Sequence, residues 1–426
     1  MIKLNLKNSK IEKKIYSYQS KVDTIHQMII NRTGQGNEML DWYNWAKTIT
    51  NTEINAINFK IKNLKTINKV DTLLVLGIGG SYLGAKAGID FINGSLRANN
   101  RVIFAGINLS SNYYKQIEEK LKNKNWAICV ISKSGKTIEP AIAFRYFRNL
   151  LEKKIGKAKM KDFIVVITDR KKGLLNNFVE KYNYQKFIIP EGIGGRFSGI
   201  TSVGLFPMAF AGINIKELLE GIKLAMDDFK NSNLKENIAY QYAVARNILY
   251  KKRLTSEIFV TYNEDFIMLG EWLKQLFGES EGKEGKGLFP NSVNYTRDLH
   301  SLGQFIQEGK KSFFETTIWQ EYEDQDVKIT KEDLDLDKLN YLEGKTIDYI
   351  NKQVLKGVLK AHTRDGNIAN IIISFNKNDE KTLGYLWYFF FIAVTCSGYL
   401  LKINPFNQPG VEIYKKHLLE NLKFKK

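Results

Sequence analysis

Short, continuous apolar runs alternate with amphipathic stretches over much of the chain. Five such runs, rich in β-branched residues, follow one another in the first half: TLLVLGI (72–78), RVIFAGI (101–107), WAICVIS (126–132), FIVVIT (163–168) and KFIIP (186–190). Runs of this kind are typical of strands buried on both faces, and helical stretches such as residues 141–154 separate them. The pattern predicts a mainly parallel sheet with helices on both sides.

The second half of the chain repeats this pattern more sparsely. Its candidate strands and long helices are residues 257–262, 264–280, 367–375 and 379–401. Residues 1–65 have a polar, helical pattern instead. We therefore expect an α/β protein with two layered units, and we place the boundary between them near residues 205–215.

One candidate helix is long enough to cross a membrane. Residues 382–401 carry no charge between Lys381 and Lys402, and about 20 apolar residues suffice for a span. Glycine and hydroxyl residues dilute this run, which has no counterpart elsewhere in the sequence, so we favour a buried core helix and expect no membrane partner. The N-terminal residues alternate lysine with apolar residues and do not resemble a signal segment. Because Cys129 and Cys396 both lie in apolar runs, we expect a cytoplasmic protein without disulfides.

The charge of the chain is strongly basic. Its 426 residues include 64 Lys and Arg against 45 Asp and Glu, a formal net charge of +19. A basic protein can bind nucleic acid, but the lysines here are scattered rather than gathered in one arm, so we expect no nucleic-acid partner. Nucleic-acid binding would instead predict DNA affinity that falls steeply with salt.

Two junctions between a candidate strand and a helix have the composition of an anion site. In the first, the strand ends at Ile78, and Gly79, Gly80 and Ser81 lead into a helix. Glycines let backbone N–H groups approach a ligand, and a helix N-terminus adds partial positive charge. Because Tyr82 stands where a dinucleotide fingerprint has its third glycine, NAD is not expected. A plain glycine turn is the other interpretation.

The second junction is ISKSGKTIEP, residues 131–140. It contains GKT, but Val130 stands where a P-loop needs its first glycine. A helix follows, which we expect Thr137 to cap. The hydroxyl and ammonium groups of the junction come from Ser132, Lys133, Ser134, Lys136 and Thr137. This set suits a phosphate monoester, and an ordinary Ser/Thr-rich cap is the alternative.

Residues 273–304 carry the densest acid–base chemistry. Gln275 and Glu279 lie four residues apart, away from the apolar stripe of their helix, and glycines beside Glu279 permit a substrate to come close. A carboxylate partly withdrawn from water can move a proton between carbon atoms. His300 follows, although a lone histidine is more often structural. No two of the four histidines have metal-ligand spacing, so no metal is expected.

Two other fragments are rich in functional groups. In GGRFSGITSVG (194–204), Arg196 follows two glycines, as a guanidinium aimed at an anion requires. NPFNQPGVEIYKK (404–416) supplies Gln408 and Lys415. Either fragment alone is equally compatible with a loop or a solvated helix face.

Together, these fragments resemble the glucose-6-phosphate isomerase family. Six of them occur in that family's order between residues 77 and 415: GIGGS, SKSGKTIEP, GGRFS, ESEGK, LHSLGQ and PFNQPGVEIYK. The resemblance implies reversible aldose–ketose isomerisation of glucose 6-phosphate and fructose 6-phosphate, in glycolysis and gluconeogenesis. The implied route is ring opening and a cis-enediol intermediate, without metal or cofactor. The implied fold has two sugar-isomerase-type three-layer α/β/α sandwich domains with mainly parallel sheets.

The resemblance also implies roles for particular residues. Glu279 matches the base that carries the proton, and Arg196 matches the residue that steadies the charged intermediate. His300 matches the ring-opening histidine, which this family contributes across a homodimer interface, and Lys415 matches a lysine near the ring oxygen. The matched substrate- and phosphate-binding residues are Gly80, Ser81, Ser132, Lys133, Ser134, Thr137, Gln275 and Gln408.

Two residues depart from the family's motifs. Lys136 stands where the family usually has Thr, and Asn407 where it usually has Asp. The first could strengthen phosphate binding or point outward, and the second puts one contact behind the site in doubt.

The expected organisation follows from these patterns. We expect a helical N-terminal extension (1–65), a smaller first domain (66–210), a larger second domain (211–402) and a C-terminal active-site segment with a helix (403–426). Another sugar-phosphate isomerase or aminotransferase of the same fold is the nearest alternative, and tests of substrate range would separate the two. A non-catalytic sugar-phosphate sensor is a further alternative, but a sensor needs no proton shuttle.

Overall fold

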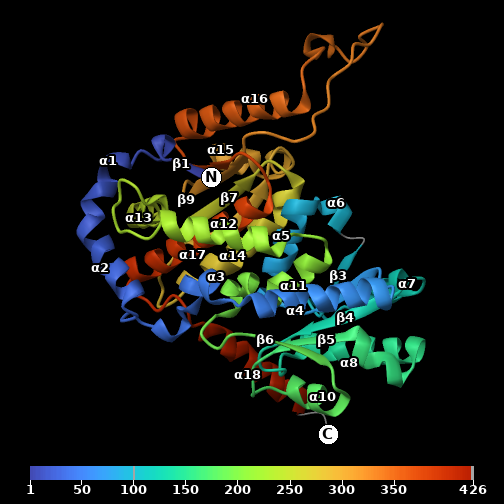
Figure 1. The fold of residues 1–426 in the computed structure, drawn as a ribbon. Helices are drawn as coiled ribbons and strands as arrows, with labels where there is room; N and C mark the ends of the chain where they lie inside the picture. Colours follow the sequence, from blue (N-terminus) through green and yellow to red (C-terminus); the bar gives the residue numbers. More distant parts are fainter. Residues whose placement is uncertain (99–100, 424–426) are drawn as a thin grey trace.

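Two five-stranded sheets organise the chain in the computed structural model, which describes residues 1–98 and 101–423 (Figure 1). The first sheet has the order β3-β2-β4-β5-β6, and all its strands are parallel. Its strands are β2 (Thr72–Leu76), β3 (Val102–Ala105), β4 (Trp126–Ile131), β5 (Ile164–Thr168) and β6 (Gln185–Ile188). Every residue of β2, β4 and β5 is buried, because helices cover both faces of a parallel sheet. All five apolar runs of the first half thus form strands, as predicted.

The second sheet has the order β1-β10-β9-β7-β8. Its strands are β1 (Ile2–Asn5), β7 (Ser256–Thr261), β8 (Phe289–Asn294), β9 (Phe313–Gln320) and β10 (Asn370–Phe375). Of these five strands, β1 alone is antiparallel to its neighbour. The sequence pattern predicts β7 and β10 but misses β8, β9 and β1, the last of which lies within the stretch expected to be helical. The mixed α/β class with mainly parallel sheets is as predicted.

Helices connect and cover the strands. In the first half of the chain the longer helices are α2 (Gln19–Ile30), α4 (Asn51–Lys62), α5 (Leu83–Asn93), α7 (Ser111–Leu121), α8 (Ile138–Ile155), α10 (Leu175–Tyr182) and α11 (Ser202–Phe210). In the second half they are α12 (Ile215–Asp228), α13 (Ile238–Lys251), α14 (Ile267–Glu281), α15 (Leu299–Glu308), α16 (Ile347–Lys360), α17 (Glu380–Leu400) and α18 (Gly410–Lys423). One-turn helices are α1 (Glu12–Ile15), α3 (Trp45–Thr48), α6 (Ser95–Ala98) and α9 (Met160–Phe163).

Helix α17 is the centre of the hydrophobic core. All its residues from Thr382 to Tyr399 are buried, and it contacts α12, α13 and α14. In the described part of the chain it is the one helix long and apolar enough to cross a membrane, but 94% of its most apolar window is buried inside the protein. The prediction of a buried core helix is therefore confirmed.

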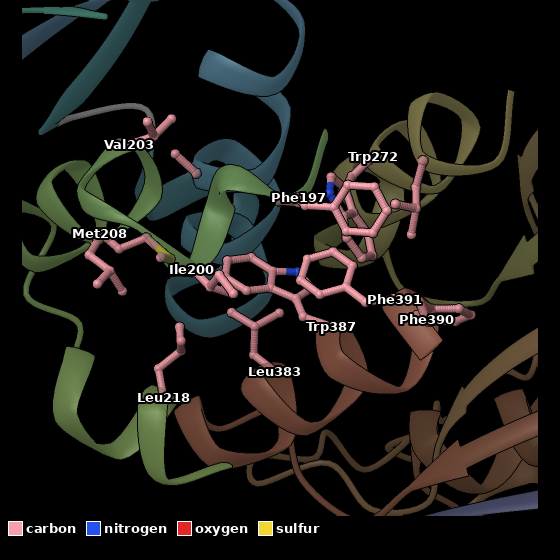
Figure 2. Close-up of a cluster of buried hydrophobic side chains, with 14 of the residues drawn as sticks. Phe197, Ile200, Val203, Met208, Leu218, Trp272, Leu383, Trp387, Phe390 and Phe391 are labelled. Carbon is pink, nitrogen blue, oxygen red and sulfur yellow. The ribbon is translucent and has the colours of Figure 1, made fainter. Parts of the chain in front are cut away.

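The core also fixes the elements that carry the site. Figure 2 shows Trp387 and Phe391 of α17 beside Phe197 and Trp272, and the ring of Phe391 packs against both of these side chains. Phe197 follows Arg196 in a short 3₁₀ helix (Gly195–Ile200), and Trp272 lies on α14, the helix of Glu279. Phe197 and Trp272 are almost fully buried. Close packing therefore holds the 3₁₀ helix that carries Arg196 and the helix that carries Glu279.

Candidate active site

A cavity of about 730 Å³ opens at the carboxyl ends of β2, β4 and β5. In parallel sheets this edge is where ligands bind, since the strand-to-helix loops converge there. The cavity brings together the loops after these strands, one face of α14 and the start of α18. Ten of the twelve predicted site residues line it: Gly80, Ser81, Ser132, Lys133, Ser134, Thr137, Gln275, Glu279, Gln408 and Lys415. Arg196 and His300 are not on its wall.

The loop between β4 and α8 folds back on itself through its own hydroxyls. Ser132 Oγ accepts the N–H of Gly135 at 3.1 Å, and Ser134 Oγ accepts the N–H of Lys136 at 3.1 Å. Thr137 occupies the N-cap position of α8, but its hydroxyl accepts no N–H of that helix. The prediction that Thr137 caps this helix is therefore wrong for its side chain, although the residue is at the N-cap position. The hydroxyl lies on the cavity wall, and no hydrogen bond engages it among the described residues.

The two lysines of this loop have different surroundings. Lys133 turns its ammonium to backbone carbonyls, 2.9 Å from Glu191 O and 3.4 Å from Pro190 O, and burial lowers its pKa. Lys136 is exposed and lines the cavity. Its ammonium forms no hydrogen bond or ion pair within residues 1–98 and 101–423. Its contribution to phosphate binding therefore stays a prediction.

Glycines bring the loop after β2 against the opposite wall. A Cβ on Gly80 would lie 2.0 Å from Gly195 O, and Gly79 has a φ of +56°. A Cβ on Gly79 would also approach Gln275 Nε2 to 3.0 Å. Glycine is needed here because two backbones and a glutamine meet without room for a side chain.

Glu279 is held by two donors while one side of it faces the cavity. Its Oε1 accepts from Gln275 Nε2 and its Oε2 from Arg196 Nη1, both at 3.2 Å. The side chain keeps 33% of its surface exposed. Gln275 uses its amide nitrogen in this contact, and its Oε1 is buried without a partner in the described part of the chain. A buried carbonyl oxygen without a donor is costly, and this atom has almost no surface open to the cavity.

Arg196 lies behind the cavity wall. Its side chain is 1% exposed and donates to Ser280 Oγ (2.8 Å), Gln408 Oε1 (3.0 Å) and Pro405 O (2.7 Å) in addition to Glu279. Burial lowers the pKa of this guanidinium, and the attraction of Glu279 opposes that effect. The fixed fork of an arginine can serve several acceptors at once. Arg196 thereby links the helix of Glu279 to the segment before α18.

The remaining two predicted residues are at the periphery. Lys415, on α18, lines the cavity and forms an ion pair with Glu412 at 2.7 Å. His300 is exposed in the first turn of α15 and takes no part in the cavity wall. Within one chain, the structure does not bring His300 to the other predicted site residues.

Polar residues that follow β5 also line the cavity and were not among the predicted site residues. Asp169 is buried in the cavity wall, and its Oδ1 accepts the N–H groups of Lys172 (2.7 Å) and Lys171 (3.0 Å). These backbone hydrogen bonds lower the pKa of the carboxyl. Lys172 also lines the cavity. The position of both residues directly after a predicted strand was the available signal.

Within residues 1–98 and 101–423, no group of three or more His, Cys, Asp or Glu side chains could hold a metal ion.

Comparison with known proteins agrees with the six ordered fragments. The phosphoglucose isomerase family model matches residues 30–321. A glucose-6-phosphate isomerase from Mycoplasmopsis pulmonis is 50% identical over 426 residues, which cover 100% of this chain and 99% of that protein. The chain belongs to the phosphoglucose isomerase family. A second member, the glucose-6-phosphate isomerase of Staphylococcus epidermidis, is 46% identical over 93% of this chain and 90% of its own length.

Solved structures extend the similarity to the fold. A hypothetical protein from Thermus thermophilus superposes with a TM-score of 0.89 at 25% identity, over 99% of this chain and 100% of that one. The glucose-6-phosphate isomerase of Chlamydia trachomatis superposes with a TM-score of 0.78 at 18% identity, over 96% of this chain and 84% of that one. The predicted family and its fold are confirmed.

Proposed function

We propose that the protein catalyses the reversible isomerisation of D-glucose 6-phosphate and D-fructose 6-phosphate, a step of glycolysis and gluconeogenesis. One observation carries this proposal: a hydroxyl-rich loop at a helix N-terminus shares a cavity with a carboxylate held by an arginine and a glutamine. The first feature suits a phosphate monoester, and the second suits proton transfer at carbon. Membership of the phosphoglucose isomerase family supports the same substrate pair.

The substrate phosphate binds at the N-terminus of α8. Ser132, Ser134 and Thr137 surround that end of the cavity, with Gly80 and Ser81 on the neighbouring loop. The helix adds partial positive charge, and Lys136 supplies a full one. Because the phosphate is remote from the reacting carbons, its binding energy serves to hold them in register with Glu279.

Glu279 is the base that moves the carbon-bound proton. In the aldose-to-ketose direction its carboxylate takes the proton from C2, and the electron pair forms the C1–C2 double bond of a cis-enediol. The carbonyl oxygen at C1 gains a proton. The carboxyl group then returns its proton to C1 while the oxygen at C2 loses one. The electrons stay within the sugar, so the step needs no redox cofactor.

Arg196 and the two glutamines support this transfer. The guanidinium lies one hydrogen bond behind Glu279 and Gln408, so its charge stabilises negative charge that develops beside them. Gln275 holds one oxygen of Glu279 and has a second polar atom without a partner among the described residues.

His300 opens the sugar ring and reaches the cavity from the second subunit of a homodimer. Lys415 lies near the ring oxygen. Two features support this assembly. His300 is exposed and lies away from the cavity of its own chain. Large apolar side chains are also exposed on α15 and on residues 321–346, a segment that projects from the body beside α16 (Figure 1). They include Leu302, Phe305, Leu334, Leu336 and Tyr341. Exposed apolar surface of this kind marks interaction sites.

The protein acts in the cytoplasm. Both of its cysteines, Cys129 and Cys396, are free and buried, as suits a reducing compartment.

Coupled turnover of fructose 6-phosphate by the Glu279→Gln variant tests the proposal. Gln keeps the shape of the side chain but is no base, so we expect kcat to fall by roughly 10²–10⁴ or more. Glu284→Gln is the matched control, because Glu284 lies on the turn after α14, is exposed and forms its ion pair with Lys286, away from the cavity wall. Near-normal turnover by Glu279→Gln would refute the assignment of the base. Absence of turnover by the wild-type protein would refute the function itself.

A further inference from the structure

A lysine outside the cavity holds the segment that leads into α18. Lys283 lies on the turn after α14 and is half-buried. Its ammonium donates to Asn404 O, to Asn407 O at 2.7 Å and to Asn407 Oδ1 at 3.2 Å. All three acceptors belong to residues 404–408, a stretch without regular secondary structure between α17 and α18.

Arg196 binds the same stretch at two other residues. It donates to Pro405 O at 2.7 Å and to Gln408 Oε1 at 3.0 Å. Two cations therefore hold five oxygens within residues 404–408. Arg196 lies in the 3₁₀ helix at 195–200, and Lys283 lies on the turn after α14. Glu279 lies on α14 and Lys283 lies on the turn that follows it. Lys283 therefore couples the position of residues 404–408 to that of the base.

We propose that Lys283 is a positioning residue for isomerisation: its ammonium fastens residues 404–408 to the end of α14 and keeps Gln408 and the start of α18 in register with Glu279. The inference rests on the function proposed above. Lys283 does not line the cavity, so its effect on the substrate passes through Gln408 and through Lys415 on α18. Small displacements of such groups are costly, since about 1 Å of misplacement can lower a rate by about 10².

The surroundings of Lys283 make this fastening depend on pH. The acceptors are neutral, because residue 407 is an asparagine and the other oxygens are carbonyls. Burial, assisted by the charge of Arg196, lowers the pKa of Lys283 to about 8 against the opposing effect of Glu279, Glu281 and Glu284. Glu281 is engaged by Arg246 in a buried pair. Above pH 8 the amine loses a proton and with it one of its donors.

Deprotonation of Lys283 changes the stability of the protein and its activity in opposite directions. Between pH 8 and the ordinary lysine value of 10.5 the unfolded chain binds the proton that the folded protein has released. This group's contribution to stability therefore rises with pH across that window. A loss of activity above pH 8 that originates at Lys283 is consequently not a loss of folded protein.

Two variants test the inference through the pH profile of kcat/KM for fructose 6-phosphate. Lys283→Met removes the donors and keeps the apolar stem, and we expect kcat/KM to fall about 10- to 100-fold at pH 7. Asn407→Asp places a carboxylate beside the amine, and we expect the alkaline fall of kcat/KM to move up by about one pH unit or more. Lys286→Met is the matched control, because Lys286 lies on the same turn and its ammonium pairs with Glu284.

The outcomes separate the inference from the function it rests on. No turnover by the wild-type protein would refute the isomerase function. With an active wild type, Lys283→Met at wild-type kcat/KM would overturn the role of Lys283. So would an alkaline limb unmoved by Asn407→Asp, or a fall in Lys283→Met activity that follows the unfolded fraction measured by circular dichroism. A lower kcat/KM with a folded protein, together with a shifted limb in Asn407→Asp, supports the positioning role.

Discussion

At the scale of single residues, the chemistry of the cavity depends on which polar groups are already engaged. Lys133 directs its ammonium to carbonyl oxygens at residues 190–191, whereas Lys136 has no partner among the described residues. Gln275 has one engaged atom and one that the described residues leave free. Lys136 and the hydroxyl of Thr137 line the cavity and are, among the described residues, the unengaged groups of their loop available to a phosphorylated sugar.

Lys136 gives a prediction at this scale. Replacing it with the family's usual residue, in Lys136→Thr, removes one cation beside the proposed phosphate. We expect KM for fructose 6-phosphate to rise about three- to fivefold at low salt with kcat unchanged, as fits an exposed ion pair. The wild-type KM should also rise more with ionic strength than that of the variant.

Steady-state kinetics at two salt concentrations make the measurement. Lys171→Thr is the control, because Lys171 is exposed in the next loop and does not line the cavity. Equal KM values for Lys136→Thr and the wild type at low salt would show that Lys136 does not contact the phosphate.

At the scale of elements, α12 and α17 meet through glycines. A Cβ on Gly384 would lie 2.1 Å from Leu218 O, and a Cβ on Gly221 would lie 2.0 Å from Lys381 O. Each glycine therefore lets the other helix's backbone approach closely. Since α17 also packs on α14, the spacing of these two helices contributes to the position of Glu279.

Gly384→Ala should therefore destabilise the protein. The added methyl has only backbone to displace, and we expect the free energy of unfolding to fall by about 2 kcal/mol or more. Gly357→Ala is the matched comparison, because Gly357 lies in α16 with nothing within 4 Å of an added Cβ in the described structure. There the higher helix propensity of alanine should raise stability by about 0.5–1 kcal/mol. Urea unfolding followed by circular dichroism measures both, and equal effects of the two substitutions would contradict the packing argument.

Elements dominated by apolar residues were predictable from the sequence, and elements with several buried polar residues were not. The strands of the first sheet are continuous apolar runs, and all of them were found. Strand β9 was missed although all its residues are buried, because it contains Glu315, Thr316 and Thr317. These side chains are satisfied by neighbours inside the protein: Glu315 accepts from Tyr295 at 2.7 Å and Thr316 donates to Glu257 at 2.6 Å. A buried polar network has no signature in the hydrophobic pattern.

The candidate site shows the same limit. The loops at strand ends were visible as glycine and hydroxyl clusters, and the ordered motifs pointed to Glu279 and Gln275. The contact of Lys283 with Asn407 joins residues 124 positions apart. Neither residue has a local pattern that predicts the other. The engagement of Lys133 by the carbonyls of residues 190–191 could not be predicted either, since it depends on how two loops meet.

At the scale of the whole molecule, the proposed active site needs two copies of the chain. We also propose the domain limits 66–210 and 211–402, with extensions at 1–65 and 403–426. The strands of each sheet lie within one of these domains, with the exception of β1, which joins the second sheet from the N-terminal extension.

Mixing two inactive variants tests the shared site. Glu279→Gln and His300→Asn each lack one residue of the proposed pair. In a mixed dimer one site carries both substitutions and the other carries neither. After unfolding and refolding an equal mixture, about half the dimers are mixed, so we expect about a quarter of wild-type turnover. Turnover no higher than that of either variant alone would show that the two residues do not act across subunits.

The central claim is that a carboxylate carries the hydrogen between C1 and C2 as a proton. Its most direct test is conversion of glucose 6-phosphate in D₂O, with deuterium at C1 of the fructose 6-phosphate followed by NMR. A proton held on Glu279 can exchange with solvent, so we predict that the wild-type protein incorporates deuterium at C1 and that Glu279→Gln incorporates none above background. Product formed by the wild-type protein without any deuterium at C1, over a range of temperatures, would indicate a direct hydride shift and contradict the claim.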